Sequence, residues 1–200
     1  ELSHVFSLAV TSHRIPRWFT EGIAVHEETS RNPEWGDRLT PDIVQAMKEK
    51  KLLPIASLDR GFIRPAYPGQ VVVSYFQAGS VCDFIHEKHG WPKLVSMMKA
   101  FRETTSTADV VKRELQVEPE EFDKRFLAWL DAKYGRTVAS FDEWTKGMKA
   151  LAGTAKAGKW EEAAGASRKL IELYPDYIEE QSPYLTLAER IGSFQSQIIS

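Results

Sequence analysis

The sequence predicts a mainly α-helical fold, and three observations lead to this prediction. Apolar residues recur every three or four positions in several stretches, most clearly between residues 91 and 134, which is the spacing of one buried helix face. Helix start signals such as Thr40-Pro41-Asp42 and stop signals such as Gly90 separate these stretches. From about residue 140 the composition shifts to Ala, Gly, Lys and Glu, which suits closely packed helices.

The helices can be assigned in chain order. In the first two thirds of the chain we expect helices over residues 1–11, 17–29, 41–51, 70–89, 91–101, 107–115 and 119–134. The triple valine at 71–73 would also suit a strand, but the residues from Gln77 onward keep a helical period. Residues 52–69 hold three prolines and two glycines, which predicts a long irregular connection. We expect Gly135 to end the 119–134 helix, and Ser140 to begin the next one as part of a capping box.

Composition excludes several classes of protein. The net charge of −2 gives no reason to expect a nucleic acid or an anionic membrane surface as partner. No stretch approaches the roughly 18 apolar residues of a transmembrane helix. The single cysteine, Cys82, rules out an internal disulfide and is expected to be a buried small hydrophobe rather than a nucleophile.

The first motif is Glu1-Leu2-Ser3-His4. A histidine directly before Glu1 would complete His-Glu-x-x-His, but that position is outside the sequence. Two imidazoles four residues apart on a helix can bind one zinc ion, and the glutamate beside the first can reach a metal-bound water. Taken alone, Glu1 and His4 favour the alternative, an N-cap glutamate and a histidine that flanks the core.

The second motif surrounds Glu21, in Trp18-Phe19-Thr20-Glu21-Gly22-Ile23-Ala24. A carboxylate on such an apolar segment is costly unless it is paired or binds a metal. Glu21 would supply the third ligand of a His₂Glu zinc site if its helix faced the first one. The alternative is a solvent-facing glutamate in the first turn of a helix, where the helix dipole favours it.

Together the two motifs resemble the gluzincin metallopeptidases, the aminopeptidase-like clan with a His-Glu-x-x-His helix and a glutamate on the next helix. The resemblance implies that Glu1 is the general base and that His4 and Glu21 are zinc ligands. The spacing from His4 to Glu21 is slightly shorter than in the large aminopeptidases, which indicates a small peptidase-like relative.

The resemblance extends to the run from Tyr75 to Val81, which aligns without a gap with a helix of the aminopeptidases. It implies that the Tyr75 hydroxyl donates to the oxyanion formed on the scissile carbonyl, a role that a neutral phenol can fill. The family pattern has a lysine where this chain has Gln77, and an ordinary core tyrosine is the alternative.

Glu28 lies seven residues after Glu21 and therefore on the same helix face. We predict that it accepts a hydrogen bond from a ligand imidazole, outside the immediate ligand set. The alternative is a surface carboxylate near the end of the helix.

The C-terminal part matches much of the tetratricopeptide pattern. Small residues, an aromatic after a turn and a closing proline occur at Leu151, Thr154, Gly158, Trp160, Ala163, Ala164, Leu170 and Pro175. We therefore predict two domains, a zincin-like helical peptidase domain at 1–138 and a tetratricopeptide-like helical module at 139–200. A plain helical hairpin is the alternative for the second domain.

The predicted fold is thus mainly α, the helical catalytic half of a zincin-like metallopeptidase followed by an α-hairpin module. The predicted function is zinc-dependent hydrolysis of peptide or protein substrates. Because one zinc ligand is missing, we expect this 200-residue chain to bind zinc weakly and to be inactive. The alternative is a non-catalytic, peptidase-like scaffold that recruits a protein partner through its C-terminal helices. Only the family resemblance favours a compartment, the bacterial periplasm or exterior.

Overall fold

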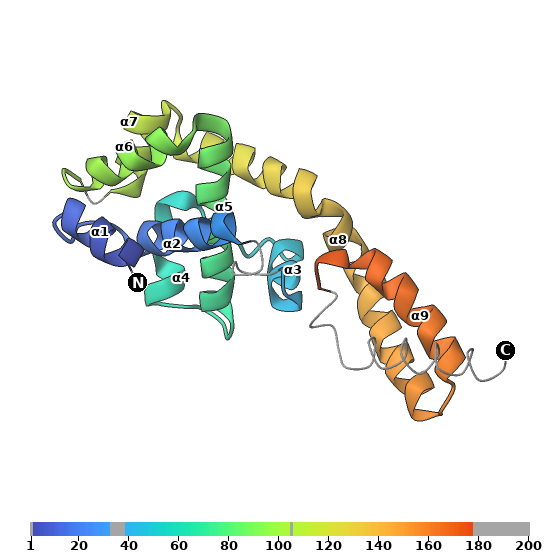
Figure 1. Cartoon of the computed structure of the whole chain (residues 1–200). Coiled ribbons are helices and arrows are strands. Elements are labelled where there is room, and N and C mark those ends of the chain that lie inside the picture. The colour runs from blue at the N-terminus through green and yellow to red at the C-terminus, as the bar shows by residue number, and fades with distance from the viewer. Residues whose placement is uncertain (1, 33–38, 105, 178–200) are drawn as a thin grey trace. The chain divides into compact units, whose positions relative to one another are not determined.

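A computed structural model describes residues 2–32, 39–104 and 106–177 (Figure 1). The chain divides into two compact units, unit 1 up to Lys133 and unit 2 from Tyr134 onward. All regular elements in the described ranges are helical, with no strand among them. The mainly α fold predicted from the sequence is therefore confirmed.

Unit 1 contains eight elements and the beginning of a ninth in its described residues. In chain order they are α1 (Leu2–Val10), α2 (Arg17–Arg31), α3 (Pro41–Lys48), the 3₁₀ helix η2 (Ile55–Ser57), α4 (Arg60–Ile63), α5 (Gln70–His89), α6 (Trp91–Phe101), α7 (Thr107–Leu115) and the first part of α8 (Pro119–Lys156). The predicted bounds of α5, α6 and α7 are confirmed to the residue. Gly90 ends α5 with a positive φ of 80°, and the side chain of Ser106 caps α7 by accepting from the Asp109 backbone N–H.

Helix α5 is the centre of unit 1. Twelve of its residues are buried, so it is covered on nearly every side. Helix α2 packs along it, and α3, α4 and α6 also contact it (Figure 1). Cys82 lies fully buried in this helix, and burial raises the pKa of its thiol, which confirms that it is a core residue and not a nucleophile.

Two glycines allow α2 and α5 to approach each other closely. A Cβ atom added at Gly22 would lie 2.6 Å from the backbone oxygen of Ala78 and 2.9 Å from the Cys82 sulfur. In the opposite direction, a Cβ at Gly79 would lie 2.6 Å from Cγ1 of Val25. The contact therefore fixes the spacing of the two helices that carry the candidate site residues Glu21 and Tyr75.

Substituting Gly22 by alanine should destabilise unit 1. The added methyl group meets backbone on α5, which cannot rotate away, so the helices must separate, at a cost of about 1–3 kcal/mol. Gly165→Ala on helix α9 (Trp160–Leu173) of unit 2 is the matched control, because a Cβ there meets nothing within 4 Å. It should stabilise its helix by up to about 1 kcal/mol. Urea denaturation followed by circular dichroism measures both changes, and a Gly22→Ala protein as stable as the parent would contradict the close contact.

Two predicted elements were wrong. Residues 52–69 are not wholly irregular but contain η2 and α4, which are too short to produce a visible periodicity in the sequence. Gly135 does not end a helix and Ser140 does not begin one, because α8 runs unbroken through both. The Ser140 hydroxyl instead lies within bonding distance of three carbonyl oxygens, those of Arg136 at 2.9 Å, Thr137 at 3.3 Å and Leu173 at 3.1 Å. A glycine inside a helix costs about 1 kcal/mol, which burial of the flanking apolar residues on α8 can offset.

Unit 2 contains the rest of α8, helix α9 (Trp160–Leu173) and the 3₁₀ helix η3 (Pro175–Tyr177). Residues 157–159 join α8 and α9 into a helical hairpin, and Gly158 takes the positive φ of 72° that this turn requires. The helices approach closely where a Cβ at Gly147 would lie 2.4 Å from Cδ2 of Leu170. An aromatic cluster of Phe141, Trp144, Tyr174 and Tyr177 covers the end of the hairpin. Residues 178–200 of the predicted C-terminal module lie outside the described residues.

Among the described helices, none combines the length and the apolar character that crossing a membrane requires.

Candidate functional site

Helices α1 and α2 bring His4 and Glu21 together. Helix α2 begins at Arg17, directly after Pro16, and this start places Glu21 on the side of α2 that packs against α1. His4 Nε2 lies 3.5 Å from Glu21 Oε2, and the two side chains are 30% and 15% exposed. The predicted ligands from the two motifs are therefore neighbours, and Glu21 does not point into solvent.

The far side of the His4 ring is held by two hydroxyl groups. His4 Nδ1 lies 3.0 Å from Thr20 Oγ1, which lies 2.7 Å from Ser7 Oγ, and the Ser7 hydroxyl donates to the backbone oxygen of His4 at 3.1 Å. Because Ser7 uses its hydrogen on this carbonyl, Thr20 donates to Ser7 and accepts from the Nδ1–H of His4. This places a hydrogen on Nδ1, so that in the neutral ring the lone pair is on Nε2, the nitrogen that faces Glu21.

Arg17 connects Glu21 to Tyr75. Its Nε donates to Glu21 Oε1 at 3.3 Å, one helical turn along α2. The pKa of the Arg17 guanidinium lies above its usual value, chiefly because of a hydrogen bond with the Tyr75 side chain and also because of the Glu21 charge. The Tyr75 ring packs edge-on against Phe62 of α4, with the centroids 5.0 Å apart.

The His4 and Glu21 donors fit a zinc ion. Two ligand atoms bound to one tetrahedral zinc lie about 3.3 Å apart, close to the separation seen between Nε2 and Oε2. A neutral imidazole and a carboxylate are both zinc ligands, and the Thr20 contact orients the imidazole as outer hydrogen-bond partners do in zinc sites. Within the described residues, no group of three or more His, Cys, Asp or Glu side chains could hold a metal ion. Glu1, the predicted general base, lies outside the described residues.

The structure leaves the role of Glu28 untested and brings further residues to the site. Glu28 is exposed, and no described side chain hydrogen-bonds to it, so its predicted role beside a ligand imidazole stays a prediction. The partner found at the His4 imidazole is Thr20, which the sequence reasoning missed together with Ser7 and Arg17. Each of the three is one helical turn from a predicted ligand or directly beside one, which is the signal that could have identified them.

Removing the Thr20 hydroxyl should weaken unit 1. Thr20→Val leaves the His4 Nδ1–H and the buried Ser7 hydroxyl without their partner, which costs about 1–3 kcal/mol. Thr29→Val on the same helix is the matched control, because the Thr29 hydroxyl bonds only to the carbonyl of Val25 one turn back, a bond of little net value. Urea denaturation measures the free energy of unfolding of both variants. Equal losses of this free energy would show that the Thr20 network does not stabilise unit 1.

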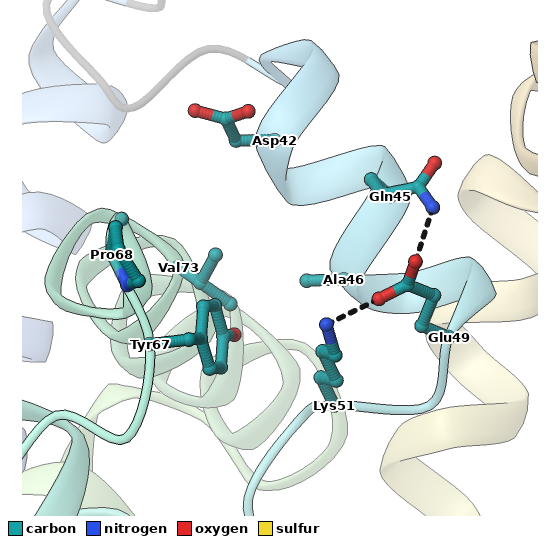
Figure 2. Close-up of a pocket in the computed structure, with 9 residues that line it drawn as sticks. Asp42, Gln45, Ala46, Glu49, Lys51, Tyr67, Pro68 and Val73 are labelled. Atoms are coloured by element: carbon teal, nitrogen blue, oxygen red, sulfur yellow. Dashed lines mark hydrogen bonds and ion pairs between the residues drawn. The ribbon is translucent and has the colours of Figure 1, made fainter.

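A separate cavity of about 210 Å³ lies between α3 and the segment that leads into α5 (Figure 2). Glu49 on its rim accepts hydrogen bonds from Gln45 and Lys51, and the Lys51 ammonium lies 5.0 Å from the centre of the Tyr67 ring. The Tyr67 hydroxyl is buried without a hydrogen-bond partner, and burial raises its pKa. No residue of α1 or α2 lines this cavity, so it is not part of the His4 and Glu21 site.

Comparison with known families identifies the domain. The family model described as the peptidase MA superfamily matches residues 1–132. The chain belongs to the peptidase MA superfamily. The match covers unit 1 almost completely and does not extend into unit 2. Neither the curated proteins nor the solved structures contain a match to the chain. Unit 1 is therefore a peptidase-like domain of a superfamily that acts on peptides or proteins and generally depends on zinc.

Proposed function

We propose that this peptidase MA domain is a zinc-dependent peptidase of the gluzincin type that hydrolyses peptide or protein substrates. The observation that carries the proposal is the convergence of His4 Nε2 and Glu21 Oε2 in a chain of this superfamily. Thr20 contacts Nδ1 of His4 and leaves Nε2 as the nitrogen available to a metal ion. Arg17 holds the other oxygen of Glu21 and thereby orients the carboxylate.

Zinc, when bound, supplies a Lewis acid that polarises the scissile carbonyl and makes a water molecule more acidic. His4 and Glu21 are the described residues that would hold it. Glu1 would accept a proton from the attacking water and deliver it to the leaving amine. Tyr75 can donate its hydroxyl hydrogen to the developing oxyanion, because a neutral phenol is a hydrogen-bond donor.

The test is hydrolysis of a mixed set of fluorogenic peptides by protein with a histidine added before Glu1. Cleavage should be lost with a chelator, restored by zinc, and abolished by Glu1→Gln with the zinc content unchanged. Zinc-loaded protein that cleaves no peptide and no denatured protein would refute the peptidase and leave the scaffold interpretation.

A hairpin of closely packed helices in unit 2 favours a second candidate, a non-catalytic peptidase-like scaffold. In this case unit 2 would be the functional part, with its tetratricopeptide-like hairpin recruiting a protein partner. The close contact of Gly147 with Leu170 and the buried small residues Ala163 and Ala164 support such a hairpin.

A further inference from the structure

A second histidine cluster lies on the α2–α5 contact. His26, five residues after Glu21 on α2, is buried, with 5% of its surface exposed. Its Nδ1 lies 2.5 Å from Asp83 Oδ1, and its Nε2 lies 2.9 Å from Nδ1 of His86, both on α5. None of these atoms contacts His4 or Glu21.

The positions of the protons follow from the partners. The Asp83 carboxylate can only accept, so His26 donates its Nδ1–H to it, and the neutral ring keeps a lone pair on Nε2. The Nδ1 of His86 must then donate to this lone pair. One proton therefore lies between two imidazole nitrogens, and the inner imidazole is oriented by a carboxylate on its other nitrogen. A carboxylate–histidine pair of this kind is the arrangement that orients imidazole ligands in metal sites.

We propose that His26 Nε2 and His86 Nδ1 form a binding site for a divalent transition-metal ion, with Asp83 as the residue that orients His26. On binding, the Nδ1 proton of His86 moves through solvent to the Nε2 of the same ring, so the imidazole stays neutral and no net proton is lost. The two nitrogens must move from 2.9 Å to about 3.3 Å apart, which His86 can do because it is exposed. Asp83 occupies the far nitrogen of His26 and does not face the ion.

Imidazole ligands select the ion class. Two neutral nitrogens suit Ni²⁺, Cu²⁺ or Zn²⁺ and do not suit Mg²⁺ or Ca²⁺, which prefer oxygen ligands. With two protein ligands and water in the remaining positions, the ion is exchangeable. Trp91, at the start of α6, stacks on His26 with centroids 5.8 Å apart and meets the His86 ring edge-on at 6.0 Å. Its indole is therefore a reporter for an ion at this site.

Titration of Ni²⁺ into tag-free protein, followed by tryptophan fluorescence, tests the proposal. All proteins in this titration carry His4→Ala, so that His4 and Glu21 cannot bind the added ion together. The chain has six tryptophans, so the signal of interest is the quenching that disappears in Trp91→Phe. We expect saturable quenching of Trp91, a dissociation constant at least about ten-fold higher in Asp83→Asn, and loss of the saturable phase in His86→Ala.

His89→Ala is the matched control, because His89 is also an exposed imidazole near the end of α5, three residues after His86. It should bind Ni²⁺ like the parent. His86→Ala and His89→Ala both change exposed side chains, and circular dichroism verifies that the two proteins fold. If Ni²⁺ quenches Trp91 in the His86→Ala protein with the same dissociation constant as in the parent, the site does not exist. The same conclusion follows if the parent shows no saturable quenching.

Discussion

A histidine placed directly before Glu1 will raise the zinc affinity of the chain by about a hundred-fold or more. It would lie four positions before His4, the spacing at which two imidazoles on one helix reach the same ion. Structural zinc sites with four ligands are worth about 10–16 kcal/mol, so one ligand contributes roughly 3 kcal/mol, or about two decades in affinity. Without the added histidine, His4 and Glu21 should bind zinc weakly or not at all.

Calorimetric titration of zinc measures this effect. The proteins compared are the chain itself, the chain with a histidine before Glu1, and the same extended chain with Glu21→Ala. An extension by alanine is the control for length. Each carries His86→Ala, so that the second histidine cluster does not contribute. Glu21→Ala should remove the affinity that the histidine adds. Tight, stoichiometric binding by the unextended chain that survives Glu21→Ala would show that the zinc site lies elsewhere.

The sequence predicted the elements whose local signals agree with their packing. Helices α5 to α7 combine apolar residues at helical spacing with a residue that marks a helix end, such as Gly90 after α5 and Ser106 before α7. At Gly135 and Ser140 the local signals favour a break, but burial along α8 outweighs them. Helix α4 has only four residues, fewer than a period needs to become visible. Local sequence patterns therefore fail to predict an element when tertiary packing overrides them. They also fail when the element is too short to show a period.

The same distinction applies to the site. His4 and Glu21 could be predicted because their motifs lie in two short stretches that the chain must bring together. The His26 contacts with Asp83 and His86 span 57 and 60 residues and depend on the register of α2 against α5. Gly22 and Gly79 fix that register through close contacts that no single-helix pattern reveals. The structure was therefore necessary to identify the second histidine cluster.

Tyr75→Phe should reduce the turnover of the peptidase by about 10²–10³-fold without changing its zinc affinity. This is the usual loss when one hydrogen-bond donor to an oxyanion is removed, and phenylalanine removes only the hydroxyl. Because the ring still packs against Phe62, the fold should be retained. The fall should appear in kcat and not in KM, since the bond forms only as charge develops on the carbonyl oxygen.

Tyr67→Phe provides the matched control for this prediction. The Tyr67 hydroxyl is buried in the cavity beside α3 without a hydrogen-bond partner, so its loss should leave turnover unchanged and cost no stability. Both variants are measured with a histidine before Glu1, by peptide hydrolysis at saturating zinc and by zinc calorimetry. A Tyr75→Phe enzyme with the parent's kcat would make Tyr75 an ordinary core residue that holds Arg17. A loss of zinc affinity instead of kcat would mean that Tyr75 acts through Arg17 on the Glu21 carboxylate.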